Sequence, residues 1–213
     1  MFTGLIETIC TIKSVRRSAD STLLTIDLGE WADESKIGDS IAVSGVCLTI
    51  AKLEGRLADF ELSTETLAKS ALGRLQPSSE VNAERAMKVA DRFGGHFVLG
   101  HIDGTAMIKA IDRHAEFADM KFAADVDLLD QMVVKGSVAV DGISLTIAHM
   151  DQNSFSVALI PWTLKRTTLG KAKIGDCVNI ETDIIVKTIK RQLDKILPKN
   201  EPLTAERLRH LGF

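Results

Sequence analysis

The sequence predicts an all-β protein of two similar domains, each a small antiparallel barrel or sandwich. The first observation is an internal repeat, because residues 40–51 (SIAVSGVCLTIA) closely match residues 137–148 (SVAVDGISLTIA). Gly45 and Gly142 set the offset at 97 residues, nearly half of the 213-residue chain. The second observation is that short runs of alternating apolar and polar residues recur in both halves, bounded by turn-forming residues. Two similar domains imply two similar pockets, which suits a protein that handles two copies of one molecule.

Strands are assigned from this alternation in chain order. The expected strands lie at residues 23–28, 40–43, 46–50 and 60–62 in the first half and at 137–140, 143–147 and 155–159 in the second. Ser44-Gly45 and Asp141-Gly142 interrupt the paired runs, and Asp-Gly is a strong tight-turn dipeptide. Closing such a sheet into a barrel also removes its exposed edges.

Helices are expected to be few. One or two turns are expected over 64–72, and a short helix over 84–93 is expected to link the halves. A longer helix is expected over 183–197, where an apolar stripe recurs at helical spacing and Pro198 follows. The stripe consists of Ile185, Ile189, Leu193 and Ile196. A stripe that follows a finished barrel favours packing on that domain or on neighbouring subunits, so we expect an oligomer.

The composition is that of an ordinary globular chain, with 45% apolar and 26% charged residues. A net charge of −3 gives no basic footprint for nucleic acid. No run approaches the roughly 20 apolar residues that cross a bilayer, and the N-terminus has no signal-peptide pattern. Cys10, Cys47 and Cys177 form no CxxC pair and no evident disulfide framework. We therefore expect a reduced, cytoplasmic protein without nucleic-acid or membrane partners.

Paired small polar residues follow the tight turn in each half. Cys47 with Thr49, and Ser144 with Thr146, stand two residues apart in expected strands. Since alternate residues of a strand share a face, each pair presents two polar groups to one side. This arrangement suits hydrogen bonding to a flat heterocycle. The alternative is that both pairs are small residues that fill a tight barrel.

A histidine distinguishes the second half from the first. The segment Gly100-His101-Ile102-Asp103 corresponds to Gly4-Leu5-Ile6-Glu7, which has no histidine. An imidazole titrates near neutral pH and can move a proton, although a lone histidine is more often structural or solvated. His96 lies five residues earlier, and this odd spacing argues against a shared metal site. No metal is expected.

Three charged residues also mark the second half. Lys135 stands where the first half has Gly38, and it is placed to reach a polar substrate edge or a charge on a partner. Glu181 and Asp183 are expected to be solvated or to cap the last helix, with Asp183 at its N-terminus.

Several common site motifs are absent from the sequence. Neither GxxxxGK[ST] nor GxGxxG occurs, so nucleotide phosphate loops are not supported. The chain has no tyrosine, which removes the aromatic residue expected of flavin-binding reductase barrels, and no GxSxG nucleophile elbow.

Five segments together resemble the riboflavin synthase family. They are the N-terminal MFTG, GVCLT at 45–49, GGHFVLGHIDGTA at 94–106, DGISLT at 141–146 and IPWTLKRTTLG at 160–170. The resemblance runs from residue 1 to about residue 191. Ser44 stands where asparagine is expected in the first repeat, and Trp162 takes a variable place in an IPxTL motif.

The resemblance implies two tandem six-stranded antiparallel Greek-key barrels plus a C-terminal α-helix. The barrels would span 1–96 and 97–183, and a trimerisation helix and tail would span 184–213. It implies a homotrimer and a reaction without cofactor or metal, and it allows an association with lumazine synthase. Two molecules of 6,7-dimethyl-8-ribityllumazine would exchange a four-carbon unit, giving riboflavin and 5-amino-6-ribitylaminouracil. One would lie on the first barrel of one subunit and the other on the second barrel of a neighbour.

Site residues are carried over by position. The first-barrel pocket is expected to comprise Gly4, Leu5, Ile6, Cys47, Leu48, Thr49, Glu61, Leu62, Ser63, Thr64, Glu65 and Thr66. The second is expected to comprise Gly100, His101, Ile102, Lys135, Ser144, Leu145, Thr146, Ile160, Pro161, Trp162, Thr163, Leu164 and Lys165. Phe2, Ser40, His96 and Asp183 are weaker candidates for shaping the pockets.

Catalytic roles are implied for four of these residues. The 7-methyl group of the substrate is acidic, so a base of modest strength suffices. His101 is the first candidate for this proton transfer, with Ser144 and Thr146 as partners. Cys47 is a candidate to supply or assist a nucleophile, a role that water could also fill.

A carrier is the alternative to an enzyme. Lumazine proteins are similar in fold and bind lumazine or flavin without turning it over. A carrier would not need polar groups in both halves, whereas this chain has Cys47 in one and His101, Ser144 and Thr146 in the other. The sequence therefore favours the enzyme.

Overall fold

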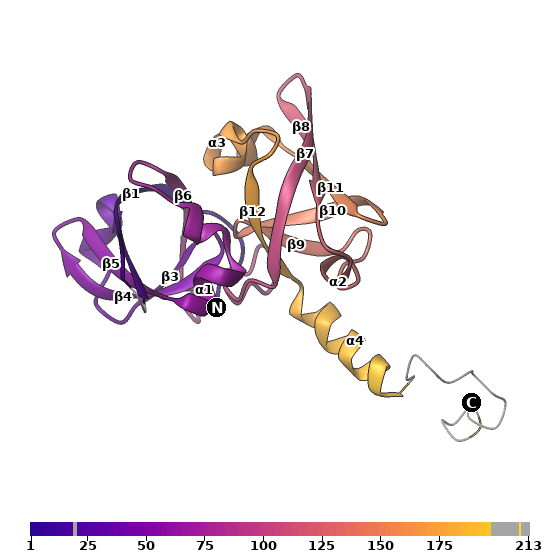
Figure 1. Cartoon of the computed structure of the whole chain (residues 1–213), viewed down its shortest axis with the longest axis horizontal. Coiled ribbons are helices and arrows are strands. Elements are labelled where there is room, and N and C mark those ends of the chain that lie inside the picture. The colour runs from indigo at the N-terminus through magenta and orange to yellow at the C-terminus, as the bar shows by residue number, and fades with distance from the viewer. Residues whose placement is uncertain (19–20, 197–208, 210–213) are drawn as a thin grey trace.

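The structure, a computed structural model, describes residues 1–18, 21–196 and 209. It confirms the predicted fold class, because two closed six-stranded antiparallel barrels stand side by side and a helix extends away from the second (Figure 1). The first barrel consists of β1 (Thr8–Arg17), β2 (Ser21–Asp27), β3 (Ser40–Val43), β4 (Val46–Glu54), β5 (Leu57–Ser63) and β6 (Glu80–Arg85). The second consists of β7 (Gly104–His114), β8 (Phe117–Ala123), β9 (Ser137–Val140), β10 (Ile143–Asp151), β11 (Ser154–Leu159) and β12 (Cys177–Thr182).

The helices are short except for the last, which extends away from the second barrel (Figure 1). The α-helices are α1 (Thr64–Lys69), α2 (Val126–Leu129), α3 (Pro161–Arg166) and α4 (Ile184–Ile196). The 3-10 helices are η1 (Gly29–Glu34), η2 (Ala71–Arg74) and η3 (Thr168–Lys171). The expected final helix is thus present as α4, and the side chain of Asp183 caps it by accepting a hydrogen bond from the amide of Ile185 at 2.9 Å.

Both barrels have the same strand order. The first closes as β1-β2-β5-β4-β3-β6, and the second as β7-β8-β11-β10-β9-β12. In each, three consecutive strands are followed by a fourth that returns beside the first of them, which is a Greek key. The register repeats as well, since Cys47 pairs with Ala42 and Ser144 with Ala139. The sequence repeat therefore reflects two copies of one barrel.

Strand alternation fills each barrel and leaves the polar pairs outside. On β4, Val46, Leu48 and Ile50 are buried in the first core, whereas Cys47 is half-buried and Thr49 is exposed. The second core has the same pattern and contains stacked Phe122 and Phe155 rings, 5.1 Å apart. Residues two apart share a face, so each polar pair lies on the outer surface of its barrel.

The two barrels meet back to back at their tight turns. Gly45 and Gly142 have φ angles of +81° and +79°, and a Cβ built on either would lie within 2.8 Å of the other's backbone nitrogen. Only glycine therefore allows this approach. Asn82 and Asn179, both fully buried, donate across the contact to the carbonyl oxygens of residues 141 and 44 at 3.0 and 2.8 Å. These reciprocal bonds join the barrels into one unit.

The linking helix expected over 84–93 is absent. Residues 80–85 form β6, which pairs with β1 and β3, and residues 86–103 contain no helix. Strand pairing overrides the local helical pattern here. Glu181 also differs from its expectation, because it is 1% exposed rather than solvated or capping a helix. The final residue of the predicted helix and the tail from 198 fall outside the described residues, apart from residue 209.

The turn residue Asp141 is expected to make stability depend on pH. Desolvation raises the pKa of its carboxyl from 3.8 to about 7, so the folded protein holds this proton more tightly than the unfolded chain. Stability should therefore fall as pH rises from about 4 to 7 and stay lowered above that. Asparagine tolerates the left-handed backbone at this position, where φ is +45°. We expect Asp141→Asn to raise Tm at pH 8 by about 2–4 °C and to change it little at pH 4.

Thermal unfolding followed at both pH values tests this expectation. Asp112→Asn serves as the control, because Asp112 is exposed on β7. A lower Tm for Asp141→Asn at pH 8, or the same difference at both pH values, would contradict the assignment.

Candidate functional site

The polar pairs lie next to the contact between the barrels. Cys47 packs against a small buried cluster made of Phe2, Ala42, Val98 and Ala139. Thr49 pairs with Ser40 on β3, and Thr146 pairs with Ser137 on β9. Each barrel thus presents a threonine and a serine side by side on its outer surface, with Cys47 or Ser144 closer to the partner barrel.

The segment that precedes each barrel, containing Gly4 in the first half and Gly100 in the second, packs on the other barrel. The Ser144 amide donates to the Gly4 carbonyl at 2.8 Å, and the Cys47 amide donates to the Gly100 carbonyl at 2.9 Å. A Cβ at Gly4 would lie 2.6 Å from the Ser144 Cβ, and one at Gly100 would overlap the Cys47 Cβ. Both contacts need glycine, and both have a positive φ.

This packing reverses the grouping expected from the sequence. Gly4, Leu5 and Ile6 were expected beside Cys47, but Gly4 contacts Ser144 and Ile6 packs on the second core. The other segment, Gly100 to Ile102, contacts Cys47 and packs on the first core. The repeat cannot reveal such an exchange, because the two segments occupy equivalent places in sequence.

His96 is the imidazole that contacts Ser144. Its Nδ1 lies 2.7 Å from the Ser144 Oγ, and its backbone amide donates to the Thr3 carbonyl at 3.1 Å. His96 as a whole is 7% exposed, and the buried Nε2 of its ring has no partner among the described residues. Desolvation lowers the pKa of His96 below its usual 6.5, against a smaller opposing effect of Asp183. The ring is therefore neutral at physiological pH.

His101 lies elsewhere. Its side chain is exposed, and its backbone amide donates to a carboxylate oxygen of Glu181 at 3.1 Å. Because Gly100 and Ile102 pack on the first barrel, the segment that carries His101 lies against the strand of Cys47. The expected partnership of His101 with Ser144 and Thr146 is not found within one chain.

Two buried glutamates bind the backbone of the segments that contain Gly4 and Gly100. Glu84 accepts from the Thr3 amide and hydroxyl at 2.6 and 2.7 Å and from the Gly4 amide at 2.9 Å. Glu181 accepts from the amides of residues 99, 100 and 101 at 2.7, 2.9 and 3.1 Å. Burial raises the pKa of both carboxyls, and the backbone N–H donors oppose this effect. The recurrence of glutamate at the 97-residue offset, two residues after an asparagine in each half, was the signal for this pair.

Helices α1 and α3 hold equivalent places in the repeat, after β5 and β11, but they differ in their side chains. In α1, Ser63 caps the Thr66 amide at 3.1 Å, and Glu65 pairs with Lys69 at 3.0 Å. In α3, the corresponding positions hold Trp162, which is 67% exposed, and Arg166, whose guanidinium lies 5.6 Å from the indole centroid. An ion pair in one barrel is thus replaced by a cation–π pair in the other.

The remaining expected residues divide between surface and core. The side chains of Leu48, Leu62 and Leu145 point into the cores, so only their backbones face the outer surface. Exposed or half-buried residues are Glu61, Thr64, Ile160, Pro161, Thr163, Leu164 and Lys165. Lys135 is exposed in a turn with φ of +69°, the same left-handed place that Gly38 takes in the first barrel.

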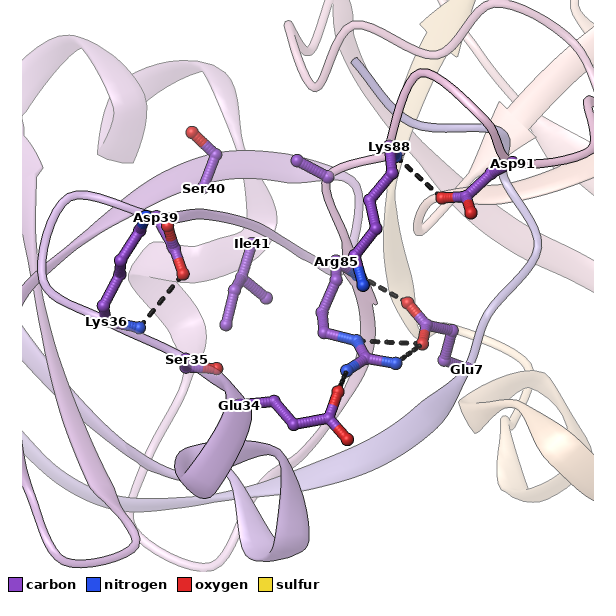
Figure 2. A pocket seen from close by; sticks show the side chains of 11 residues that line it. Glu7, Glu34, Ser35, Lys36, Asp39, Ser40, Ile41, Arg85, Lys88 and Asp91 are labelled. Carbon is purple, nitrogen blue, oxygen red and sulfur yellow. Dashed lines mark hydrogen bonds and ion pairs between the residues drawn. The ribbon is translucent and has the colours of Figure 1, made fainter.

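A polar cavity of about 640 Å³ lies on the first barrel beside Ser40 (Figure 2). The Arg85 guanidinium bonds to Glu7 and Glu34, each at 2.7 Å, and fills one side of it. Lys36 and Lys88 line the cavity with Asp39 and Asp91. The corresponding place on the second barrel differs, since Lys187 of α4 bonds to Asp103 there at 2.7 Å.

The described residues contain neither a metal-binding cluster nor a membrane-spanning helix. No group of three or more histidine, cysteine or acidic residues among them is arranged to hold a metal ion. In the same residues, no helix has the length and apolar character needed to span a membrane. All three cysteines are free.

Comparisons with known proteins agree with the duplicated architecture. The lumazine binding domain family matches twice, at residues 3–86 and 99–183. The chain is 40% identical to the riboflavin synthase of Actinobacillus pleuropneumoniae over 216 aligned positions, covering 100% of both chains. It is 41% identical to that of Bacillus subtilis (strain 168), covering 92% of this chain and 91% of the relative.

Solved structures share the fold at lower identity. LumP complexed with 6,7-dimethyl-8-(1'-D-ribityl) lumazine superposes with a TM-score of 0.78 at 20% identity, covering 85% of this chain and 99% of LumP. LumP complexed with riboflavin gives a TM-score of 0.79 at 21% identity with the same coverage. The match of two domains along most of the sequence, and the full-length relatives, establish that this chain belongs to the riboflavin synthase family.

Proposed function

We propose that this chain converts two molecules of 6,7-dimethyl-8-ribityllumazine into riboflavin and 5-amino-6-ribitylaminouracil, at a site shared between two subunits. The family is one of enzymes that transfer a four-carbon unit. The observation that carries the proposal is the pair of equivalent outer barrel faces, one with Cys47 and Thr49 and the other with Ser144 and Thr146. A reaction between two copies of one molecule needs two related pockets with different chemical groups.

The overall reaction needs no further reactant. The two products together contain every atom of two substrate molecules, so no oxidant, reductant or group donor is consumed. The enzyme must move a proton from the acidic 7-methyl group, support attack on the second ring and return protons later. Side chains that exchange protons near neutral pH are sufficient for such work.

The contact between the barrels favours a site shared between subunits. The space beside Cys47 within one chain holds Phe2, Ala42, Val98 and Ala139, none more than 3% exposed. Gly45 and Gly142 are in backbone contact at the same interface. Two stacked rings therefore do not fit between the barrels of one chain. A neighbouring subunit would bring its second barrel to the outer face of this first barrel.

Ser144 and His96 would serve proton transfer in the second pocket. The neutral imidazole can accept the hydroxyl proton as the Ser144 oxygen takes a proton from the substrate methyl group. Thr146, exposed on the same face of β10, would hold a polar edge of the ring. Lys135 and the residues from Ile160 to Lys165 would surround that ring and its ribityl chain.

Cys47 and His101 would serve the first pocket. Cys47 is half-buried and free, and it faces the segment that carries His101. We propose that the thiol adds to or contacts the acceptor ring, with water as the alternative nucleophile, and that His101 moves the associated proton. Thr49 and the residues from Glu61 to Thr66 would hold the ring, together with Gly100 and Ile102. Gly4, Leu5 and Ile6 would border the second pocket.

Much of the acceleration would come from orientation. Holding two reactants in a reactive geometry contributes on the order of 7–11 kcal/mol. Helix α4 supports an assembly that could do this, because Ile185, Ile189, Leu193 and Ile196 are each at least half exposed. We propose a homotrimer joined through α4 and located in the cytoplasm. An association with lumazine synthase stays a prediction.

One assay tests the proposed activity. Purified protein is mixed with 6,7-dimethyl-8-ribityllumazine in buffer that contains a metal chelator, and riboflavin absorbance is followed. We expect riboflavin to form in a ratio of one per two lumazines consumed. Tight binding of lumazine without riboflavin formation would identify a carrier instead and would rule out the enzyme.

A further inference from the structure

We propose that each substrate pocket is fixed in place by a buried glutamate of the opposite barrel. Glu181, on β12 of the second barrel, positions the Cys47 pocket of the first. Glu84, on β6 of the first barrel, positions the Ser144 pocket of the second. The inference rests on the proposed function only in treating these as the substrate pockets, and its test does not require turnover.

The first connection runs from Glu181 to Cys47. Both carboxylate oxygens of Glu181 accept backbone N–H bonds, and the bond from Gly100 is 2.9 Å long. The carbonyl of the same Gly100 accepts the Cys47 amide at 2.9 Å, although Cys47 belongs to the other barrel. Gly100 therefore links the carboxylate to the pocket through a single residue.

The second connection runs from Glu84 to Ser144 and repeats the first. The Gly4 amide donates to Glu84 at 2.9 Å, and the Gly4 carbonyl accepts the Ser144 amide at 2.8 Å. Thr3 adds two further bonds to the same carboxylate through its amide and hydroxyl. The two connections thus cross at the contact between the barrels.

The glycine contacts leave little freedom for these segments to shift. A Cβ at Gly4 or Gly100 would overlap Ser144 or Cys47, so the peptide lies directly against the partner strand. Both glycines also have left-handed φ angles, near +80°. Small changes in the direction of the glycine carbonyl would therefore change the position of the β4 or β10 backbone at the polar pair.

The two carboxylates hold the Gly4 and Gly100 segments firmly, because they are buried and each accepts several hydrogen bonds. Glu84 is 4% exposed and Glu181 is 1% exposed. Bonds from backbone N–H groups to an ionised acceptor are about twice as strong as neutral ones. A glutamine has one acceptor oxygen and introduces N–H donors, so it would leave some of these amides without a partner. The segment would then be released from its fixed place.

Amide hydrogen exchange of the whole protein tests the crossed arrangement. Glu181→Gln should speed exchange of the Cys47 amide about tenfold or more and leave the Ser144 amide unchanged. Glu84→Gln should do the reverse. Each variant is the control for the other, because the two substitutions are equivalent in the repeat. Exchange is read at single-residue level by NMR, without substrate.

Cysteine alkylation gives a second test of the connection from Glu181 to Cys47. The rate at which iodoacetamide alkylates Cys47, measured by peptide mass spectrometry, should rise in Glu181→Gln. It should stay the same in Glu84→Gln. Carboxylate is retained in Glu181→Asp, which should restore part of the protection at Cys47.

A milder variant, Thr3→Val, keeps the inference testable if a glutamine variant does not fold. Thr3→Val removes one donor to Glu84 and should speed exchange at Ser144 alone. Faster exchange confined to the barrel that carries the substitution, or equal at Cys47 and Ser144, would overturn the inference. Failure of the riboflavin assay with the crossed exchange pattern intact would instead overturn the proposed function.

Discussion

Ser144→Ala is expected to lower kcat for riboflavin formation by about 10²-fold or more, with a smaller change in KM. The Ser144 hydroxyl is the polar group of the second pocket that contacts a buried imidazole, 2.7 Å from the His96 Nδ1. Alanine removes the oxygen that would take the methyl proton and leaves the pocket's shape nearly unchanged. His96→Gln should lower kcat by a similar factor, because the hydroxyl then loses its proton acceptor.

The pH profile gives a second readout for this pair. Burial lowers the pKa of His96, so the imidazole becomes protonated at a lower pH than an exposed histidine does. We therefore expect kcat to decline only at lower pH. Ser156→Ala on β11 is the matched control and should behave like the unaltered protein. Turnover of Ser144→Ala within twofold of that control would remove Ser144 from the mechanism.

The paired substitution Ile189→Asp with Leu193→Asp on α4 is expected to give monomers with at least about 100-fold lower activity. A site shared between chains loses the orientation of its two rings when the chains separate, and orientation is worth on the order of 7–11 kcal/mol. The barrels themselves should stay folded, because no residue of α4 is buried in the chain. Both replaced side chains are at least half exposed.

Analytical ultracentrifugation and the riboflavin assay, run on the same samples, test this expectation. Val89→Asp is the control, because Val89 is a fully exposed apolar residue outside α4. It should leave both assembly and activity unchanged. A monomer with full activity would contradict the shared site, whereas an unchanged trimer would show that α4 does not hold the assembly.

The barrels could be predicted because their signals are local and occur twice. The tight turns at Gly45 and Gly142 and the alternation around Cys47 and Ser144 each specify a hairpin without reference to the rest of the chain. The same alternation placed the polar pairs correctly on one face. The duplicated order of these signals also predicted two equivalent barrels.

The sequence could not predict which barrel the Gly4 and Gly100 segments pack on, because the two repeats are equivalent. Gly4 and Gly100 hold equivalent places, so packing on their own barrel or on the opposite one leaves the same sequence pattern. The structure is decided by long-range contacts, such as the amide of Ser144 on the carbonyl of Gly4. His96 was underrated because its contact with Ser144 joins residues 48 positions apart in sequence, which no local pattern predicts.

The sequence pattern around Glu84 was misread for a different reason. Its neighbours suit a helix locally, but β6 pairs with two strands, and the carboxylate accepts three bonds from residues some 80 positions away. A bonding partner so far away in sequence cannot be predicted from the few residues around Glu84. The repeat of Glu84 at Glu181 is a cue that a window of a few residues cannot use.

Complementation between two blocked chains tests the shared site most directly. Thr49→Trp should fill the first pocket and Thr146→Trp the second, because both threonines are exposed on the outer faces of β4 and β10. Each variant alone should form riboflavin at a small fraction of the normal rate. Co-expressed with different tags and purified as mixed assemblies, they should recover activity well above that of either alone, because an open first barrel then meets an open second barrel from another chain. Mixed assemblies that stay as inactive as the separate variants would contradict a site shared between subunits.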